Sequence, residues 1–251
     1  MPDYTPDTAA AAIVRVCRER FHLTVTTGRH GDTLYAQLQM PGFLRRLAAE
    51  GNLATVDSDR IGDLLMTTTQ MSLSTHPPIT FYLLQITDPD APGIELRYVT
   101  YLDDIRRLYA SALGEVEFFD RRIQELKLRP DELAMSDPWI ERGVTLGEFL
   151  AVQLALRIKA KGLQDAALAA WGLQDCVGWF HQGVLSLTVV REPATEDAAD
   201  AAWPQPVLTL IAQVLTEYQF TDYHHVLLSD TATMQTQELT RAQIEGYVIS
   251  R

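Results

Sequence analysis

The sequence predicts an α+β fold: antiparallel β-hairpins with helices packed on one face, followed by a helix-rich half. Two observations favour this class. Strand-like segments come in adjacent pairs joined by short turns rich in Gly and Pro, and they do not alternate singly with helices, as a doubly wound parallel sheet requires. From Asp103 onward, most segments have the spacing of helices.

Composition limits the classes of partner and compartment. The 251 residues are 47% hydrophobic and 22% charged, which is typical of one large globular domain or two small ones. The net charge of −12 repels phosphate, so nucleic acid is not expected as a partner. We also expect no membrane span and no signal peptide, because no apolar run reaches about 18 residues and Asp3 and Asp7 precede the first one. Two cysteines cannot form a disulfide framework, so we expect a cytoplasmic protein.

The first part of the chain predicts a helix, a hairpin and two further helices. The first helix runs over 8–20 with Thr5 or Asp7 as its cap, and period-two alternation on both sides of a Gly-rich loop predicts a hairpin over 22–40. A short helix follows over 43–50. Residues from 57 or 58 to 73 favour a helix, with a strand from Met66 as the alternative.

A second hairpin is predicted over 79–102. Its connection, "DPDAPG", contains only residues that favour turns, so Asp88 and Asp90 are interpreted as turn residues and not as calcium ligands. The next helix runs from Asp103 to a stop at Gly114.

The second half is expected to be mainly helical. Thr145 and Glu148 form a capping box at the start of the strongest helical pattern in the chain. The expected segments are helices over 115–128, 145–162, 163–173, 207–218 and 236–248, strands over 183–190 and 223–229, and an acidic loop or linker over 191–206. We therefore expect an α+β hairpin region over 1–114 and a helix-rich region with short strands over 115–251, with a single domain as the alternative. The sequence has no clear internal repeat.

The segment "TVTTGRHGDT" contains Arg29-His30-Gly31 after a strand-like stretch. The five residues from Arg29 to Thr33 resemble the Arg-His-Gly-Glu-Thr stretch of the histidine phosphatases. That resemblance implies that His30 accepts a phosphoryl group and that Arg29 binds it, with His181 in "FHQGVL" as a second catalytic histidine.

The residues around this segment favour a hairpin loop instead. The preceding strand alternates with threonines, whereas a strand buried on both faces reads as a continuous apolar run. Thr27-Gly28 stand where an apolar residue is expected, and no Ser-x-x-x-Arg helix start supplies a second phosphate-binding arginine. We therefore expect Gly28 and Gly31 to allow the chain to reverse, with Arg29 and His30 at an exposed tip.

Two further patterns are weak as sites. A zinc site needs three or four convergent ligands, whereas neighbours such as His224 and His225 point to opposite faces of a strand, and Cys176 and His181 do not share a helix face. Glu125-x-Lys127, downstream of Asp103-Asp104, resembles the carboxylates and lysine of restriction-type nucleases. Those residues belong on adjacent strands, and here they lie in a helical pattern, so a solvated helix face is expected. No metal or cofactor is expected.

These observations favour a cytoplasmic protein–protein interaction or assembly module without catalysis. Titratable residues are plentiful, but no set of them has a catalytic spacing. The expected partner is a protein or a second copy of the chain, engaged by an acidic surface and hairpin edges. The alternative is a hydrolase-type enzyme whose site gathers distant residues. Its candidate site residues are Arg29, His30, His181, His224 and His225.

Overall fold

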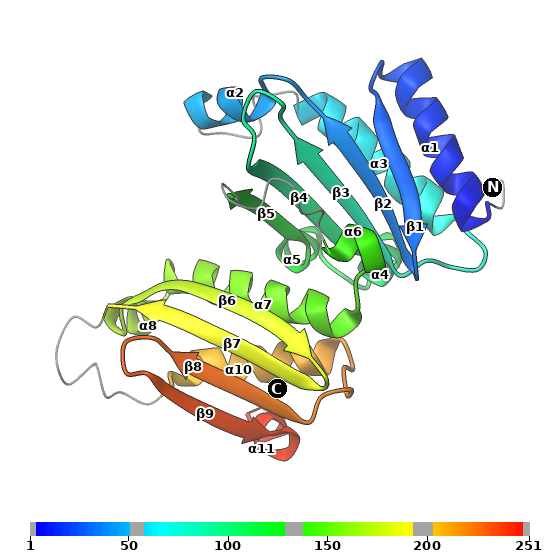
Figure 1. The fold of residues 1–251 in the computed structure, drawn as a ribbon. Helices are drawn as coiled ribbons and strands as arrows, with labels where there is room; N and C mark the ends of the chain where they lie inside the picture. Colours follow the sequence, from blue (N-terminus) through cyan, green and yellow to red (C-terminus); the bar gives the residue numbers. More distant parts are fainter. Residues whose placement is uncertain (1–3, 51–57, 129–137, 193–202, 248–251) are drawn as a thin grey trace. The chain divides into compact units, whose positions relative to one another are not determined.

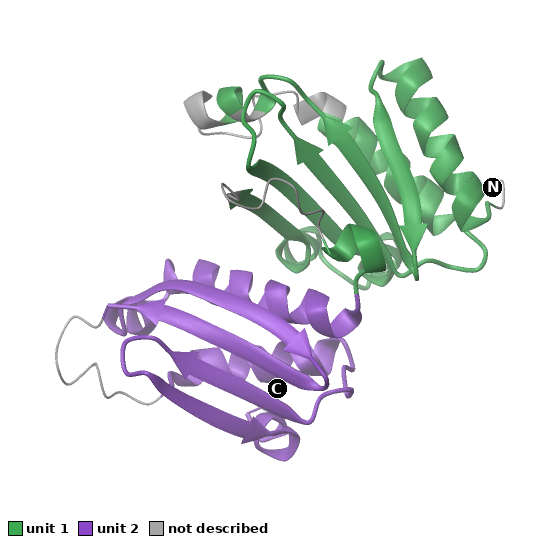
Figure 2. Ribbon diagram, viewed as in Figure 1, with its two compact units in different colours: residues 1–144 green, residues 145–251 purple. Residues whose placement is uncertain are grey.

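The computed structural model describes residues 4–50, 58–128, 138–192 and 203–247 (Figure 1). It divides the chain into two compact units, residues 1–144 and 145–251, which we call unit 1 and unit 2 (Figure 2). Both contain helices and a mixed sheet, so the predicted α+β class is confirmed. The division falls after Val144, later than the boundary considered at Gly114, because a strand that follows Gly114 pairs with the sheet of unit 1.

Unit 1 is built on a five-stranded sheet in the order β1-β2-β3-β4-β5. The central β2–β3 pair is parallel, and the other neighbours are antiparallel. Its elements are α1 (Pro6–Arg20), β1 (Val25–His30), β2 (Thr33–Gln39), α2 (Phe43–Glu50), α3 (Ser58–Leu73), β3 (Phe81–Thr87), β4 (Ile94–Tyr101), α4 (Leu102–Tyr109), α5 (Glu115–Arg121), β5 (Ile123–Leu128) and α6 (Pro138–Arg142).

Helices α1 and α3 pack against one face of this sheet (Figure 1). Alternate strand residues point toward them, and burying these side chains provides the hydrophobic driving force for the layer. The fully buried residues of this layer include Ile13, Cys17, Leu34, Ala36, Leu64, Tyr82, Leu84 and Ile86. The predicted cap of α1 is confirmed as Thr5, whose hydroxyl accepts the backbone N–H of Thr8.

Unit 2 is built on a four-stranded sheet in the order β6-β7-β8-β9, again with a parallel central pair, β7–β8. The predicted capping box at Thr145 and Glu148 begins its longest helix. Figure 1 shows α7 and α10 on the same face of the sheet. Its elements are α7 (Leu146–Gly162), α8 (Ala166–Ala170), β6 (Leu173–His181), β7 (Val184–Arg191), α10 (Gln205–Glu217), β8 (His225–Asp230), β9 (Gln235–Thr240) and α11 (Arg241–Glu245).

The two units repeat one arrangement of elements. The series α1-β1-β2-α3-β3-β4-α4 corresponds to α7-β6-β7-α10-β8-β9-α11, with the same sequence of antiparallel, parallel and antiparallel pairings. In both, the first helix packs on the first strand and a short helix follows the fourth strand directly. This structural repeat leaves no clear trace in the sequence, since similar packing can be achieved by different apolar residues.

Close packing between α7 and β6 depends on glycines. A Cβ at Gly178 of β6 would lie 2.0 Å from the backbone oxygen of Ala151 in α7. A Cβ at Gly147 would lie 2.3 Å from the Phe180 ring. Helix α7 therefore approaches β6 at a distance that only glycine permits at these positions.

A buried ion pair holds the far end of the second sheet together. The Arg191 side chain is fully buried and donates to Asp230, with 2.7 Å between Nε and Oδ2, and its guanidinium lies 4.7 Å from the centre of the Trp171 ring. Burial opposes ionisation of Asp230. The hydrogen bonds donated by Arg191, the Ala232 N–H and the Thr233 hydroxyl nevertheless bring its pKa below the ordinary value of 3.8.

The sequence prediction was wrong in three segments of the second half, which therefore contains more strand than expected. Residues 123–128 form strand β5, not the end of a helix, and residues 235–240 form β9, not the start of one. Strand β6 was not predicted, because apolar residues on both of its faces hide the alternation. Cys176 and Phe180 lie on one face, and Val177 and Trp179 lie on the other. The helix expected from residue 58 is confirmed as α3.

Two other expectations concern segments that are only partly described. The loop or linker expected over 191–206 falls between Arg191, which ends β7, and Gln205, which begins α10. Most of it, 193–202, lies outside the described residues. None of the described helices is both long and apolar enough to cross a membrane.

We expect Gly178→Ala to destabilise the protein by about 3 kcal/mol or more, because the added Cβ meets the backbone of α7, which cannot move aside as a side chain can. The matched control is Gly62→Ala in α3, where an added Cβ meets no atom within 4 Å. That control should stabilise by about 0.5–1 kcal/mol, since alanine restricts the unfolded chain. Urea unfolding measures both, and equal effects would refute the close packing.

Asp230→Asn should lower the free energy of unfolding at pH 7 by about 3 kcal/mol, because it removes the carboxylate charge that pairs with the buried Arg191. The folded-state pKa of Asp230 lies below its ordinary value, so its contribution is complete above about pH 4 and is lost as the pH falls through the folded pKa. Urea unfolding should therefore show a smaller difference between wild type and variant at pH 3 than at pH 7. Asp222→Asn, at an exposed carboxylate, is the control.

Candidate functional site

The Arg29-His30-Gly31 segment lies at the end of a hairpin, as predicted. Strand β1 is an edge strand whose described neighbour is the antiparallel β2, so His30 does not follow a central parallel strand. The Arg29 side chain is held within the turn, with its Nε donating to the Gly31 oxygen at 2.6 Å and its charge 3.8 Å from Asp32. His30 is exposed, and its ring stacks on Tyr35. Both groups thus face solvent without forming a phosphate pocket.

Gly28 and Gly31 were both expected to allow the chain to reverse, but only Gly31 lies in the turn. Gly31 has a φ of +55° and lies in the two-residue turn between His30 and Thr33. Gly28 instead lies inside β1, where a Cβ would come within 2.3 Å of the Tyr35 hydroxyl. One side of the tip is also covered, because the buried Thr33 hydroxyl accepts the N–H of Val144 at 2.8 Å.

The other candidate histidines gather at one end of the second sheet. His181 ends β6 and His225 begins β8, and both pair with Val184. The turn between β6 and β7 has positive φ at both Gln182 and Gly183, which is the type I′ geometry that suits a hairpin. His225 Nδ1 lies 2.7 Å from Glu238 Oε1, and His224 packs over Gly183. Among the residues that the structure describes, no three His, Cys, Asp or Glu side chains form a group that could hold a metal.

Both cysteines are buried structural residues. Burial raises the pKa of Cys17 to about 11. Burial, aided by the Asp175 carboxylate, raises that of Cys176 to about 12, although Lys159 acts in the opposite direction. A thiol with such a pKa is almost entirely protonated at neutral pH and is a poor nucleophile and a poor metal ligand. Cys176 and His181 also point to opposite faces of β6, because they are five residues apart on one strand.

Glu125 and Lys127 lie on a strand, which corrects the helical assignment. They belong to β5, and Glu125 pairs with Arg97 on the adjacent β4. The buried Arg97 guanidinium donates to the Glu125 carboxylate and lies 3.9 Å from the centre of the Trp139 ring. On the same face, Gln85 donates to Glu95 at 2.5 Å. This is a polar layer beneath α6, and both of its carboxylates already have partners.

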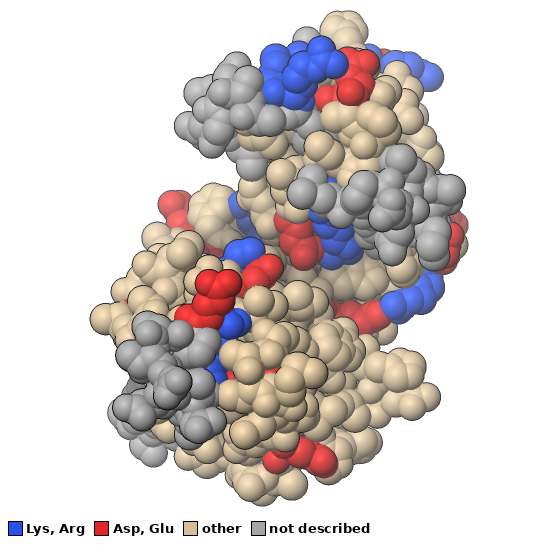
Figure 3. All heavy atoms as spheres, turned by 60° about the vertical axis from the view of Figure 1, so that its left-hand side comes forward, with Lys and Arg blue, Asp and Glu red and all other residues tan. Residues whose placement is uncertain are grey.

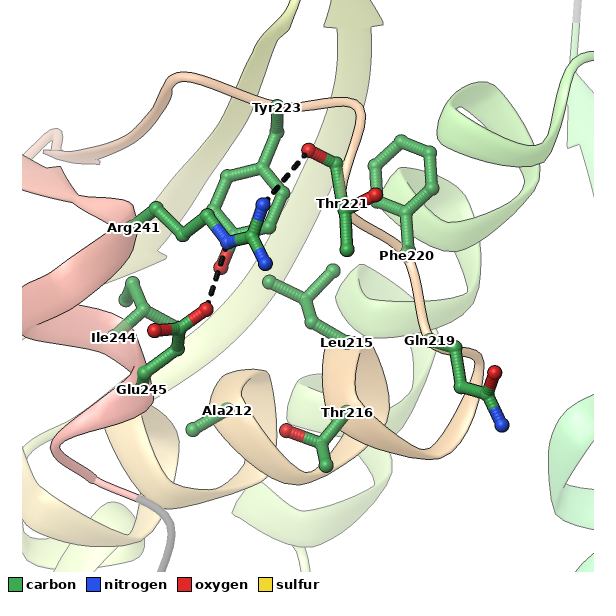
Figure 4. A pocket seen from close by; sticks show the side chains of 10 residues that line it. All are labelled: Ala212, Leu215, Thr216, Gln219, Phe220, Thr221, Tyr223, Arg241, Ile244 and Glu245. Atoms are coloured by element: carbon green, nitrogen blue, oxygen red, sulfur yellow. Dashed lines mark hydrogen bonds and ion pairs between the residues drawn. The ribbon is translucent and has the colours of Figure 1, made fainter.

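A small pocket lies between the end of α10, the loop before β8 and α11 (Figure 4). Its volume is about 190 Å³, and its floor contains Leu215 and Ile244. The two charged side chains at its rim, Arg241 and Glu245, bind each other at 2.7 Å, and Arg241 also donates to the Thr221 oxygen. The pocket is smaller than most ligand sites, which measure about 300–1,000 Å³, and its charges are satisfied internally.

The most distinctive surface is the face of the second sheet that points away from α7 and α10. We call it the open face. Strand register and alternation assign to it Asp175, Val177, Trp179 and His181 of β6, Val184, Ser186, Thr188 and Val190 of β7, His225, Leu227 and Ser229 of β8, and Thr236, Glu238 and Thr240 of β9. Val177, Trp179 and Val190 are 53%, 49% and 41% exposed, respectively. Its carboxylates are Glu238 and Asp175, and Asp175 Oδ1 lies 2.9 Å from Lys159 Nζ.

Figure 3 shows one side of unit 2. Much of the surface seen there is uncharged, and its Lys, Arg, Asp and Glu side chains lie in small groups. Sequence reasoning did not select Trp179, Val177 or Glu238, because the two strands that carry them were not predicted. The signal that could have found Trp179 is its position two residues before His181, on the strand that leads into the "HQG" turn.

Comparisons with known proteins supply no further guide. The chain matches no protein-family model, no curated protein and no solved structure. Function is therefore inferred from the geometry and chemistry of the described residues.

We expect both native thiols to react slowly with iodoacetamide at pH 8, because their raised pKa values leave little thiolate and burial blocks access. In 6 M guanidinium chloride, both should react at the rate of a free cysteine. Mass spectrometry of alkylated peptides measures each site separately. Rapid native labelling of Cys176 would contradict its assignment as a structural residue.

Proposed function

We propose that the chain is a non-catalytic protein-interaction module of the cytoplasm that binds its partner through the open face. The observation that carries this proposal is the half-exposed Trp179, with exposed Val177 beside it on the same face of β6. Exposed Val190, which pairs with Asp175, extends the apolar group beyond Val177 on β7. Tryptophan is among the residues that dominate binding energy at protein interfaces, and apolar clusters with few charges characterise their centres.

The chemistry of the face supports binding more than catalysis. Apart from two carboxylates and two histidines (Asp175, Glu238, His181 and His225), its side chains are apolar or hydroxyl-bearing, and Ser229 and Thr236 already hydrogen-bond each other at 3.0 Å. Such a surface can be desolvated at low cost, which favours association with a protein. The net charge of −12 favours a partner with basic groups and disfavours nucleic acid.

A photocrosslinking amino acid, benzoylphenylalanine, placed at position 179 of the full chain should form protein adducts in cells, because the open face contacts the partner. The matched control is the same amino acid at position 116, since Val116 in α5 of unit 1 is 78% exposed but lies outside this face. Gel shifts and mass spectrometry detect the adducts. Equal adducts at both positions, or none at 179, would refute the proposal.

A second measurement separates binding from folding. Trp179→Ser should change the free energy of unfolding by less than about 1 kcal/mol, because half of the ring is already in water. The same variant, carrying benzoylphenylalanine at position 177, should lose its adducts. A large loss of stability would instead assign Trp179 to the core.

A further inference from the structure

The structural repeat shows which surfaces unit 2 leaves without a cover. In unit 1, strand β5 pairs antiparallel with the outer edge of β4. Helix α6 follows it and places Trp139 over Arg97, on the face of the sheet opposite α1 and α3. Strand β5 and helix α6 thus supply an edge strand and a cover for the second face.

Unit 2 has no counterpart of that stretch among its described residues. Its fourth strand, β9, has β8 as its described neighbour, and the short helix α11 begins directly after Thr240. In unit 1, α4 likewise begins directly after Tyr101 of β4. Thr240 therefore corresponds to Tyr101, and Glu238 corresponds to Val99, which faces Ile123 of β5.

Apart from the charge of Glu238, strand β9 lacks the features that usually protect an edge. Its residues, "QTQELT", include no Pro, Lys or Arg, and all of them except Leu239 are exposed. Natural edge strands are normally blocked by prolines, lysines, bulges or a covering element, because their unpaired N–H and C=O groups can bind another strand. The β8–β9 register is regular over all six residues, so the outer edge of β9 is straight enough to continue the ladder.

We propose that the partner of unit 2 adds an antiparallel strand to the outer edge of β9, in the place that β5 occupies on β4, and presents a Lys or Arg to Glu238. This inference rests on the proposed function and specifies its mode. Residues directly opposite in an antiparallel pair have Cβ atoms about 4.5–5.5 Å apart, so a basic side chain at that position reaches the carboxylate. The added strand extends the open face, on which its alternate side chains then lie beside those of β9.

Charge favours a basic partner strand over a second copy of the chain. Two copies of β9 paired about a twofold axis can place Glu238 opposite its own copy, and each chain carries a net charge of −12. The existing contact of Glu238 with His225 involves one carboxylate oxygen at 2.7 Å, and the side chain remains 58% exposed. The carboxylate is therefore accessible to a second cation.

The test uses a phage-displayed library of random 12-residue peptides, selected on the full chain. Selected peptides should carry Lys or Arg within an alternating apolar pattern, and hydrogen exchange should show new protection of the backbone amides of 235–240. Glu238→Lys should weaken their binding by tenfold or more. Asp222→Lys makes the same charge change at an exposed loop position before β8 and should weaken it by less than twofold.

Several outcomes would overturn the inference. These are the absence of any binding peptide, protection confined to β6 and β7, or a chain–chain dimer that protects β9. Glu238→Gln provides a second variant if Glu238→Lys fails to fold, and the exchange measurement on the native chain needs no variant. Adducts from position 179 without protection of β9 would refute the strand addition alone, whereas loss of those adducts would refute the proposed function.

Discussion

The parallel pairing of the two central strands determines the layout of each unit. Strands that run side by side in the same direction cannot be joined by a tight turn, so the chain crosses over through a helix, α3 in unit 1 and α10 in unit 2. That helix must bury its apolar side against the sheet, and the preceding helix, α1 or α7, packs beside it. One face of each sheet is therefore always covered, and the other depends on additional chain.

Local patterns predict the parts of the fold that local chemistry determines. The Gly31 turn and the "DPDAPG" turn mark both hairpins of unit 1, and the Thr145–Glu148 capping box marks the start of α7. Strands β5 and β9 were missed because residues such as Glu, Leu, Gln and Lys favour helices in isolation, and only pairing with β4 and β8 overrides that preference. The parallel pairs were not predicted either, since register between distant strands leaves no local signature.

The candidate site could not be predicted for a related reason. An exposed tryptophan and a buried one look alike in a sequence until the strand and its two faces are assigned. On β6, Gly178 faces α7 and Trp179 faces away, but this follows only from the contact of Gly178 with Ala151. The candidate histidines were easier to notice because their chemistry is distinctive, yet the structure gives them turn and surface positions. Residues that bind through shape and apolar area have no such chemical mark.

The second faces of the two sheets differ in charge. Such a difference is expected if the chain itself covers the face of unit 1 permanently, whereas a partner covers the open face of unit 2 reversibly. In unit 1 the face carries charges, because each meets a partner from the same chain: Arg97 bonds Glu125 and lies on Trp139. Such a pair is costly to desolvate, and that cost is met once, during folding. A face covered only when a partner arrives would incur the cost at every encounter. Because few charges surround Trp179, the open face avoids this desolvation cost. Glu238, on the edge strand, then selects the partner by charge.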